Sequence, residues 1–176
     1  MSVIPVPDSC LVLLVGPSGS GKTTFAHRNF LSTEVVSSDA CRALVADDEN
    51  MLDANEDAFA LLHAIVAARL RRGRLTVVDA TNISAQAREP LIRLAREHGR
   101  PPVAVVFDLD RTVLMERGRA RSERSLPAHV VSRHIAQLRR SLSTLGSEGF
   151  DQVTVLRSAD EVRAATVERT TLRTGR

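Results

Sequence analysis

Residues 16–23 form a glycine-rich segment, GPSGSGKT, that combines the residue types needed to bind phosphate. The segment fills each constrained position of the pattern G-x-x-x-x-G-K-[ST], the P-loop that holds nucleoside triphosphates. Its glycines allow backbone N–H groups to turn toward phosphate oxygens, and a helix that begins there adds partial positive charge. The ammonium group of Lys22 can reach the β- and γ-phosphates, and the hydroxyl of Thr23 can bind Mg²⁺.

The elements around this segment follow the order that a P-loop requires. An apolar run at residues 11–15 predicts a strand before it, and residues 22–30 predict a helix after it. Lys22 is the only lysine of the chain, at a position where a slim ammonium group suits better than a planar guanidinium. We therefore predict that ATP and Mg²⁺ bind here, and that the phosphates contact Gly16, Ser18, Gly19, Ser20, Gly21, Lys22, Thr23 and Thr24.

A carboxylate and an arginine follow the second predicted strand, residues 34–38. A hydroxyl that attacks a phosphate must lose its proton, and Asp39 can accept that proton as a general base. Arg42 lies three residues later, on the same side of a helix that begins here, and can bind a phosphate of the acceptor. The alternative role for Asp39 is the N-cap of that helix. The P-loop favours catalysis, and the two roles are compatible.

Asp79 ends a third apolar run, residues 75–79, in the manner of a Walker B strand. Its carboxylate is predicted to orient Mg²⁺ or the waters of the ion, together with the hydroxyl of Thr23. Thr81 and Asn82 follow in the next loop, where they can contact the acceptor or the nucleotide. Both are also common turn residues, so a purely structural role is an equally supported alternative.

Three arginines, Arg117, Arg121 and Arg124, recur at spacings that place them on one face of a helix. Their guanidinium groups repel each other unless anions lie between them. A lid over the nucleotide, at about residues 111–127, would bring the β- and γ-phosphates to these arginines. Positive charge there would also stabilise the transition state of phosphoryl transfer. The alternative is a basic helix exposed to solvent.

Strands and helices alternate along the chain. Apolar runs predict strands at residues 11–15, 34–38, 75–79, 103–107 and 153–156. Helical spacing and capping residues predict helices at residues 22–30, 39–46, 55–71, 84–98, 111–121 and 128–145, and one that starts near residue 160. This order is typical of an α/β fold with a mostly parallel, five-stranded sheet covered on both faces. Ligands bind beyond the carboxyl ends of such strands, where the predicted site residues all fall.

The composition favours one globular domain over residues 1–176. Hydrophobic residues make up 43% of the chain and charged residues 26%. No apolar stretch approaches the roughly 20 residues that cross a bilayer, so no membrane segment is expected. Residues 1–9 contain two prolines and no basic residue, and are not expected to be a signal peptide. The two cysteines lack metal-ligand spacing and are expected to be reduced thiols in a cytoplasmic protein.

Basic residues are concentrated at residues 69–74, 111–124 and 133–140, whereas acidic residues gather at 47–57. Basic stripes are typical of proteins that bind polyanions, although solvated helix faces have the same composition. The chain has five phenylalanines but no tyrosine or tryptophan, so it has few side chains on which bases can stack. A nucleic-acid ligand would therefore be bound mainly through its phosphates.

Taken together, the P-loop, the Val36–Arg42 segment with the acidic residues after it, the strand ending in Asp79-Ala80-Thr81-Asn82, and the arginines of residues 116–124 resemble a known family. This family is the 5′-hydroxyl kinase domain of bacterial RNA-repair polynucleotide kinase-phosphatases. The resemblance covers nearly the whole chain. It implies a P-loop phosphotransferase fold with a lid, and ATP-dependent phosphorylation of 5′-hydroxyl ends of RNA or DNA.

Carried onto matching positions, the resemblance implies that Lys22 and Thr23 serve the ATP phosphates and Mg²⁺. It implies that Asp39 is the general base, that Arg42 holds the acceptor phosphate, and that the three arginines of the predicted lid bind the nucleotide. In the family, this domain is followed by a phosphatase domain and a ligase-like domain. Neither is present in these 176 residues, so the chain is expected to be an isolated kinase module, either free-standing or, as the favoured alternative, the N-terminal module of a larger repair protein.

Two alternative functions remain compatible with the sequence. A small-metabolite kinase would use the same P-loop but a closed acceptor pocket. A nucleotide-dependent switch would hydrolyse the nucleotide slowly and would need no general base at Asp39. The sequence also leaves open the preference for RNA or DNA, the range of nucleotide donors, and whether the chain forms a homodimer.

Overall fold

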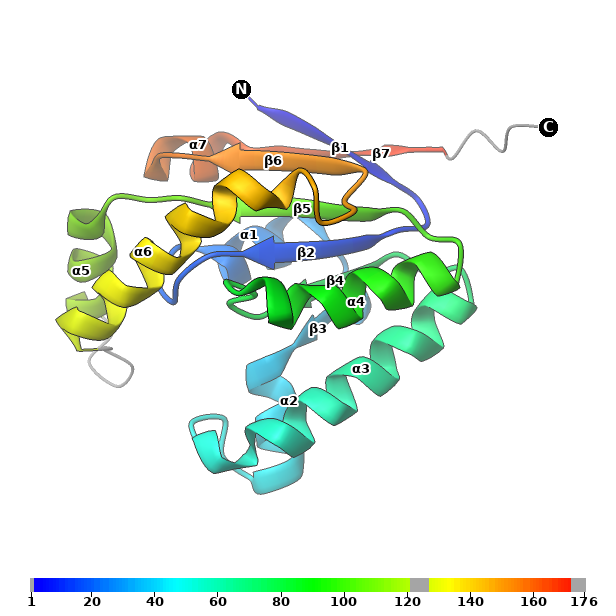
Figure 1. Ribbon diagram of the computed structural model, residues 1–176, viewed down its shortest axis with the longest axis horizontal. Coiled ribbons are helices and arrows are strands. Elements are labelled where there is room, and N and C mark those ends of the chain that lie inside the picture. The colour runs from blue at the N-terminus through cyan, green and yellow to red at the C-terminus, as the bar shows by residue number, and fades with distance from the viewer. Residues whose placement is uncertain (1, 121–126, 172–176) are drawn as a thin grey trace.

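The structure, a computed structural model, describes residues 2–120 and 127–171. Its centre is a five-stranded parallel sheet with the strand order β3-β4-β2-β5-β6 (Figure 1). The strands are β2 (Leu11–Val15), β3 (Val35–Ser37), β4 (Thr76–Asp79), β5 (Pro102–Phe107) and β6 (Gln152–Leu156). The five-stranded parallel sheet predicted from the apolar runs is thus confirmed. Leu14 pairs with both Asp79 and Val105, so the carboxyl ends of the three central strands lie side by side.

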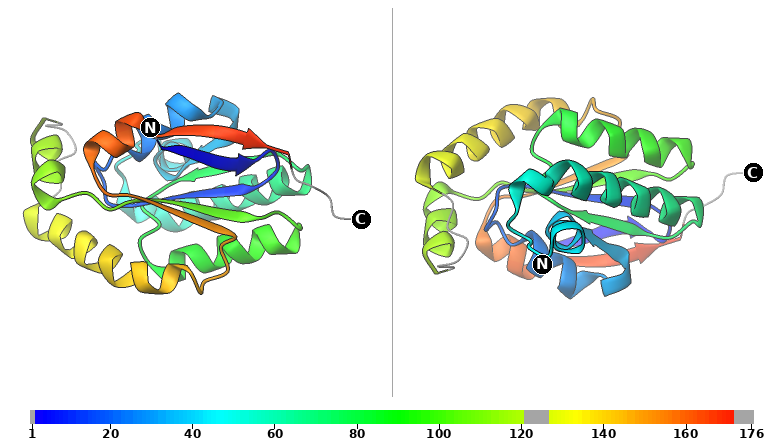
Figure 2. Two further views of the ribbon diagram at one scale, coloured as in Figure 1. Left: turned by 90° about the horizontal axis from the view of Figure 1, so that it is seen from above. Right: turned by 90° about the horizontal axis from the view of Figure 1, so that it is seen from below.

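Helices cover both faces of this sheet (Figures 1 and 2). They are α1 (Lys22–Asn29), α2 (Ser38–Ala46), α3 (Asn55–Arg71), α4 (Ala85–Glu97), α5 (Arg111–Ala120), α6 (Ala128–Leu145) and α7 (Ala159–Ala164), with short 3₁₀ turns η1 (Ser32–Glu34) and η2 (Leu52–Ala54). Helices α3 and α4 and part of α6 pack on one face, and α1 and α7 pack on the other. Both α3 and α6 have the bounds that their apolar spacing predicts.

The central strands are buried on both faces, which explains why they are continuous apolar runs. In β2, Leu11, Leu13 and Val15 point to the core under α3 and α4, while Val12 and Leu14 point to the core under α1. Each fully buried side chain of this kind contributes about 1.5–3 kcal/mol relative to exposure. The sheet is therefore a rigid platform for the loops at its carboxyl edge.

A second, two-stranded sheet lies outside the central one. It consists of β1 (Val3–Pro7) and β7 (Thr166–Thr170), which pair in parallel, with Val3 opposite Thr166. The apolar runs do not predict either strand, because only Ile4 and Val6 of β1 face the core and β7 is mostly polar. Figure 2 shows these strands side by side next to α1, and Ile4 and Val6 of β1 share a core with Phe25 of that helix.

Local signals explain where most elements begin and end. Ser84 caps α4 by accepting a hydrogen bond from the amide of Ala87 at 3.2 Å. Gly73 and Gly99 follow α3 and α4 with φ angles of 68° and 63°, which favour glycine. Within residues 2–120 and 127–171, no helix has the length and apolar character needed to span a bilayer.

Candidate active site

The P-loop connects β2 to α1 at the carboxyl edge of the sheet. Gly16 packs so tightly that a Cβ atom there would lie 2.9 Å from the carbonyl oxygen of Phe107. Its N–H donates to the carbonyl of Thr81 at 2.9 Å, which ties the loop to the end of β4. Gly21 caps α1 with a φ of 98° and offers no side chain to the first amide groups of the helix. Those amide groups are therefore suited to bind an anion.

Lys22 begins α1 and is 7% exposed. Its Nζ donates a hydrogen bond to the carbonyl oxygen of Pro17 at 2.8 Å, within the same loop. This contact folds the side chain back over the P-loop, where phosphates are expected. The ammonium group is thus held in position by the loop that it serves.

Thr23 and Asp79 meet at the predicted magnesium site. The hydroxyl of Thr23 donates to Oδ2 of Asp79 at 2.7 Å, and Asp79 is 6% exposed at the end of β4. A hydroxyl and a carboxylate are the hard oxygen ligands that Mg²⁺ prefers, so these residues fit the ion. Among the described residues, no group of three or more His, Cys, Asp and Glu side chains could hold a metal. Phosphate oxygens and waters would have to complete the coordination.

Asp39 and Arg42 lie on the same side of the first turns of α2, as their spacing predicts, and they form an ion pair. Both Nη atoms of Arg42 donate to Oδ1 of Asp39, at 2.9 and 2.6 Å. The N-cap of α2 is Ser37, whose hydroxyl accepts from Ala40, so Asp39 does not serve as the cap. The carboxylate is half-exposed, which leaves it accessible to an acceptor.

The side chain of Arg42 is 8% exposed, and further hydrogen bonds hold it in place. Its Nε donates to the side chain of Asn55 at 3.2 Å, and its Nη1 donates to the carbonyl of Glu49 at 3.2 Å. These bonds tie α2 to the start of α3 and orient the guanidinium plane. Local spacing does not point to Asn55, because Asn55 and Arg42 are thirteen residues apart along the chain.

The two loop residues after β4 have different environments. Thr81 is exposed and lines the cavity described below. Asn82 is 3% exposed and adopts a φ of 47°, and its side-chain amide donates to the carbonyl of Leu14 at 2.9 Å. These contacts favour the turn role that was left open for Asn82, since its amide joins β2 to the loop after β4.

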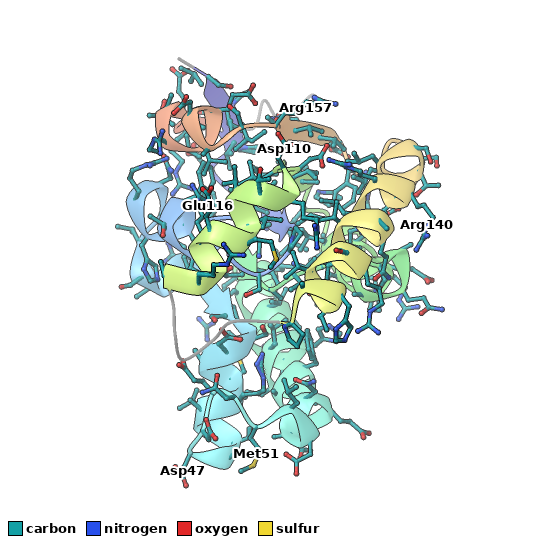
Figure 3. The ribbon with its side chains drawn as sticks, turned by 90° about the vertical axis from the view of Figure 1, so that its left-hand side faces the viewer. Asp47, Met51, Asp110, Glu116, Arg140 and Arg157 are labelled. Carbon is teal, nitrogen blue, oxygen red and sulfur yellow. The ribbon has the colours of Figure 1, made fainter. Side chains whose placement is uncertain are left out.

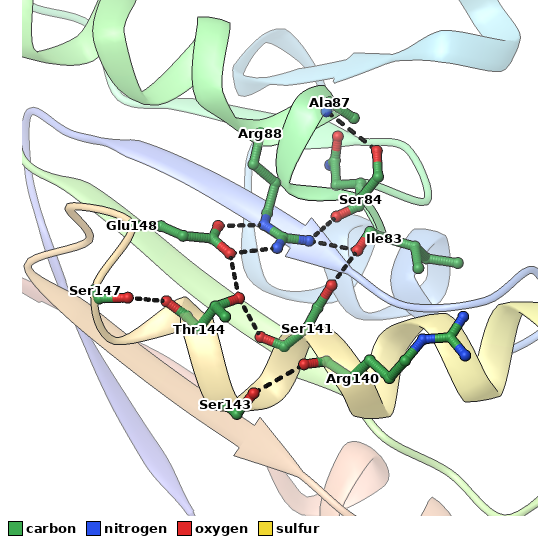
Figure 4. A network of polar contacts seen from close by, with 11 residues as sticks. Ile83, Ser84, Ala87, Arg88, Arg140, Ser141, Ser143, Thr144, Ser147 and Glu148 are labelled. Atoms are coloured by element: carbon green, nitrogen blue, oxygen red, sulfur yellow. Dashed lines mark hydrogen bonds and ion pairs between the residues drawn. The ribbon is translucent and has the colours of Figure 1, made fainter.

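The loop after β4 is also held by a buried arginine that the sequence analysis missed (Figure 4). Arg88 of α4 is fully buried, and its Nη1 donates to the carbonyls of Asn82 and Ile83 at 2.8 and 2.6 Å. Its Nε and Nη2 donate to the two carboxylate oxygens of Glu148, at 2.7 and 2.6 Å. A sequence signal existed, because Arg88 precedes Leu91 and Ile92 on the apolar stripe of α4.

Glu148 is the acidic partner in this network. Burial by itself would raise the pKa of its carboxyl, but the hydrogen bonds and charge of Arg88, together with the Thr144 hydroxyl, outweigh burial and lower the pKa. Glu148 is therefore ionised at neutral pH, and the bidentate pair is charge-assisted. The network joins the end of α6 to the loop that supports the P-loop.

The described part of the predicted lid reaches the P-loop through Arg117 of α5. Its Nη1 donates to the carbonyls of Gly19 and Ser20, at 3.3 and 3.2 Å. Arg117 thus contacts the loop that is predicted to bind phosphate, but it does not line the cavity described below, whereas the next residues, Gly118 and Arg119, do. Arg121 and Arg124 lie outside the described residues, so their predicted role in the lid stays a prediction.

One cavity of about 690 Å³ joins these groups. Figure 3 looks onto this end of the molecule, with α5 in front, α6 to its right and the α2–α3 region below. Of the predicted site residues, the cavity is lined by Ser18, Gly19, Gly21, Lys22, Thr23, Thr24, Asp39, Arg42, Asp79 and Thr81. It is also lined by residues that the sequence analysis did not assign to the site, which include Asn55, Phe59, Leu114, Arg119, Arg133 and His134.

His134 is expected from the sequence to lie at the edge of the core, without chemistry. The structure places it on the cavity wall, where burial, Arg133 and Lys22 lower the pKa of its imidazole. It is therefore neutral at pH 7 and adds no charge to the site. No hydrogen-bond partner for its buried Nδ1 is found among the described residues.

Replacement of Arg117 tests the lid contact. We expect Arg117→Ala to weaken the binding of ATP·Mg²⁺ by about 10- to 100-fold, since hydrogen bonds to charged groups contribute about 1.5–3 kcal/mol. Isothermal titration measures this change. Arg111→Ala is the control, because Arg111 begins the same helix, is exposed and donates to Ser132 instead. An unchanged affinity in Arg117→Ala would remove Arg117 from the nucleotide site.

Comparison with known families and structures places this geometry in context. The family model described as an AAA domain matches residues 11–145. A search of curated proteins found no match. A chain in the structure of the Pnkp1/Rnl/Hen1 RNA repair complex is 26% identical, with a TM-score of 0.69 over 80% of this chain and 47% of that one. The present chain thus spans about half the length of that relative.

Two further structures match over nearly their whole length. A putative kinase from Chloroflexus aurantiacus is 19% identical, with a TM-score of 0.60 over 88% of this chain and 91% of that one. A gluconokinase from Sinorhizobium meliloti is 18% identical, with a TM-score of 0.56 over 90% of each chain. These two likenesses concern the fold alone. With the sheet order and the P-loop, the comparisons identify the α/β P-loop kinase fold.

Proposed function

Because the chain belongs to the AAA-domain family and is a P-loop kinase, we propose that it transfers the γ-phosphate of ATP to the 5′-hydroxyl ends of RNA or DNA. One observation carries the proposal: the Asp39–Arg42 pair lines the same cavity as Lys22 and Thr23. A carboxylate beside an arginine can take the proton of a hydroxyl and bind a phosphate next to that hydroxyl. The 26% identity to a chain of an RNA repair complex supports a nucleic-acid acceptor.

On the acceptor side, Asp39 takes the proton of the 5′-hydroxyl as its oxygen bonds to the γ-phosphorus and the bond to the β–γ bridging oxygen breaks. ADP carries away the electron pair of that bond. Arg42 donates both Nη atoms to Asp39, and its contacts to Asn55 and Glu49 hold it rigid. In the proposed reaction, the same guanidinium also contacts the phosphate that follows the terminal nucleoside.

On the donor side, Lys22 and Arg117 supply positive charge around the P-loop. Phosphoryl transfer spreads negative charge over the γ-phosphate oxygens, so fixed cations there lower the barrier. Mg²⁺, when bound, would be held by Thr23 and Asp79 and would neutralise charge on the β- and γ-phosphates. The buried position of Asp79 keeps its carboxylate oriented for that task.

The experiment that tests this function is transfer of labelled γ-phosphate from ATP to a single strand of about ten nucleotides with a 5′-hydroxyl. We expect transfer to RNA or DNA that is abolished when the acceptor already carries a 5′-phosphate. A protein that binds ATP but phosphorylates no RNA or DNA end would contradict the proposal.

A second candidate is a kinase for a small metabolite. The volume of the cavity, about 690 Å³, lies in the range of small-molecule sites, and Phe59, Leu114 and Met115 give it an apolar part. Phosphorylation of a sugar acid or a nucleoside with a higher kcat/KM than any oligonucleotide would favour this candidate. The two candidates share Asp39 as the general base and differ in the size of the acceptor.

The domain organisation follows from the same proposal. If the acceptor is a broken nucleic-acid end, this kinase is one module of a longer repair protein that also carries phosphatase and ligase-like domains. The likeness to less than half of a chain in a repair complex supports this arrangement. Sequencing the flanking coding region would test it directly.

A further inference from the structure

Two surfaces of opposite charge flank the cavity. Residues 47–57, which we call the acidic arm, comprise the connection from α2 to α3 and the first turn of α3, and they contain no basic residue. Their acidic side chains are all exposed, and they are Asp47, Asp48, Glu49, Asp53, Glu56 and Asp57. In Figure 3, the labelled Asp47 and Met51 mark the tip of this arm at the bottom of the view, while Arg140 of α6 projects at the right-hand side.

The positively charged surface is the exposed face of α6, which we call the basic face. It contains His129, Arg133, Ala136 and Arg140, which recur at helical spacing and are all exposed. Arg133 also lines the cavity, whereas Arg140 lies two turns further along the helix and outside it. The face therefore starts at the site and leads away from it.

Arg133 and Arg140 differ from Arg139, the arginine beside Arg140 in the sequence, in their acidic partners. Arg139 lies within 3.5 Å of Asp108 and 3.8 Å of Asp110, so its charge is balanced within the fold. Within residues 2–120 and 127–171, neither Arg133 nor Arg140 has an acidic side chain at ion-pair distance. Exposed guanidinium groups of this kind are suited to phosphates of a bound polyanion.

We propose that the basic face of α6 carries the acceptor strand away from the active site, so that phosphates beyond the terminal nucleotide contact Arg133 and then Arg140. This inference rests on the proposed function. Seven residues of helix rise about 10 Å, which corresponds to about three phosphate spacings of 3.4 Å in a stacked strand. A dinucleotide bound at Asp39 is therefore too short to reach Arg140, whereas an acceptor of about ten nucleotides reaches it.

The acidic arm makes a path of the acceptor strand across residues 47–57 unfavourable. A strand that crossed it would bring phosphates close to six exposed carboxylates, and like charges within the screening distance of about 8 Å repel each other. Bases have little to stack on along α6, because the basic face contains no aromatic ring other than His129. Contacts along the path are therefore made to the backbone and do not depend on the base sequence.

The test compares a dinucleotide and a ten-nucleotide single strand, both with a 5′-hydroxyl, as acceptors for wild type and Arg140→Glu. We expect Arg140→Glu to raise KM for the longer acceptor by about three- to tenfold at moderate salt, and to weaken the dependence of KM on salt. The kcat for both acceptors and the KM for the dinucleotide stay unchanged. The matched control is Arg71→Glu, which makes the same charge change at an exposed arginine that ends α3, at the opposite edge of the sheet.

Three results would overturn this path. Equal KM values for the longer acceptor in wild type and Arg140→Glu would remove α6 from it. A similar increase of KM in Arg71→Glu would reduce the effect to net charge. A larger change on neutralising the acidic arm with Asp47→Asn and Asp48→Asn would place the strand on the other surface. Failure of wild type to phosphorylate either acceptor is a different result, since it contradicts the proposed function itself.

Discussion

Asp39→Asn is expected to slow phosphate transfer by about 10²- to 10⁴-fold, the usual contribution of a general base. The amide has the same shape as the carboxylate and can still accept a hydrogen bond from Arg42, but it cannot take up a proton. ATP binding is expected to stay within about twofold, because Asp39 lies outside the P-loop and is half-exposed. Single-turnover transfer and ATP titration measure the two effects separately.

The control for this variant is Asp47→Asn at the other end of α2. Asp47 has a φ of 56°, and asparagine tolerates this left-handed conformation, so the change removes one charge without strain. We expect normal transfer rates from it. If Asp39→Asn also keeps the normal rate, the proton leaves by another route and the nucleotide-dependent switch becomes the better interpretation of the fold.

Arg88→Met is expected to lower the free energy of unfolding by about 3–5 kcal/mol, because it removes the cation that pairs with Glu148 and the arginine donor of the Asn82 and Ile83 carbonyls. Hydroxyl donors remain for Glu148 (Thr144) and for Ile83 (Ser141). The loss is large because Arg88 is fully buried, so water cannot replace its hydrogen bonds. Urea unfolding measures it. Arg93→Met, on the exposed side of the same helix, is the control and should change the unfolding free energy by less than about 0.5 kcal/mol.

The pH dependence gives an independent check of the same pair. The pKa of Glu148 is lowered below its ordinary value of 4.5, so the pair contributes its full stability above that pH. This contribution is lost as the pH falls from 4.5 through the lower pKa of the folded protein, where Glu148 takes up a proton. In Arg88→Met this acid step should disappear. An acid profile that is the same in both proteins would show that the pair does not stabilise the fold.

Sequence patterns predict the parts of the fold that depend on local physics. Both β2 and β5 are continuous apolar runs because both of their faces are buried, and α3 and α6 show one apolar stripe each. The small sheet was missed for a different reason. Pro5 and Pro7 argue against a central strand, but β1 lies at an edge and pairs only with β7 among the described strands, so the missing N–H groups are tolerated.

In the candidate site too, some residues can be predicted from local spacing and others cannot. The P-loop residues are contiguous, and Asp39 and Arg42 are one helical turn apart, so spacing alone brings them together. Arg88 and Glu148 are sixty residues apart, and Arg133 and His134 reach the cavity only because α6 packs over the end of the sheet. No local sequence pattern predicts these contacts between distant residues, since they depend on the assembled fold.

During synthesis, β1 leaves the ribosome long before β7, the strand with which it pairs. Ile4 and Val6 are almost fully buried in the complete fold, but they cannot reach this state until β7 has been synthesised and pairs with β1. Arg28 of α1 likewise waits for the carbonyls of Val162 and Ala165, to which it donates at 2.7 and 2.9 Å. Joining segments so distant in the chain is slow. A nascent chain that stops before residue 159 would thus contain the complete P-loop sequence, but α1 would lack its hydrogen bonds with α7 and β7.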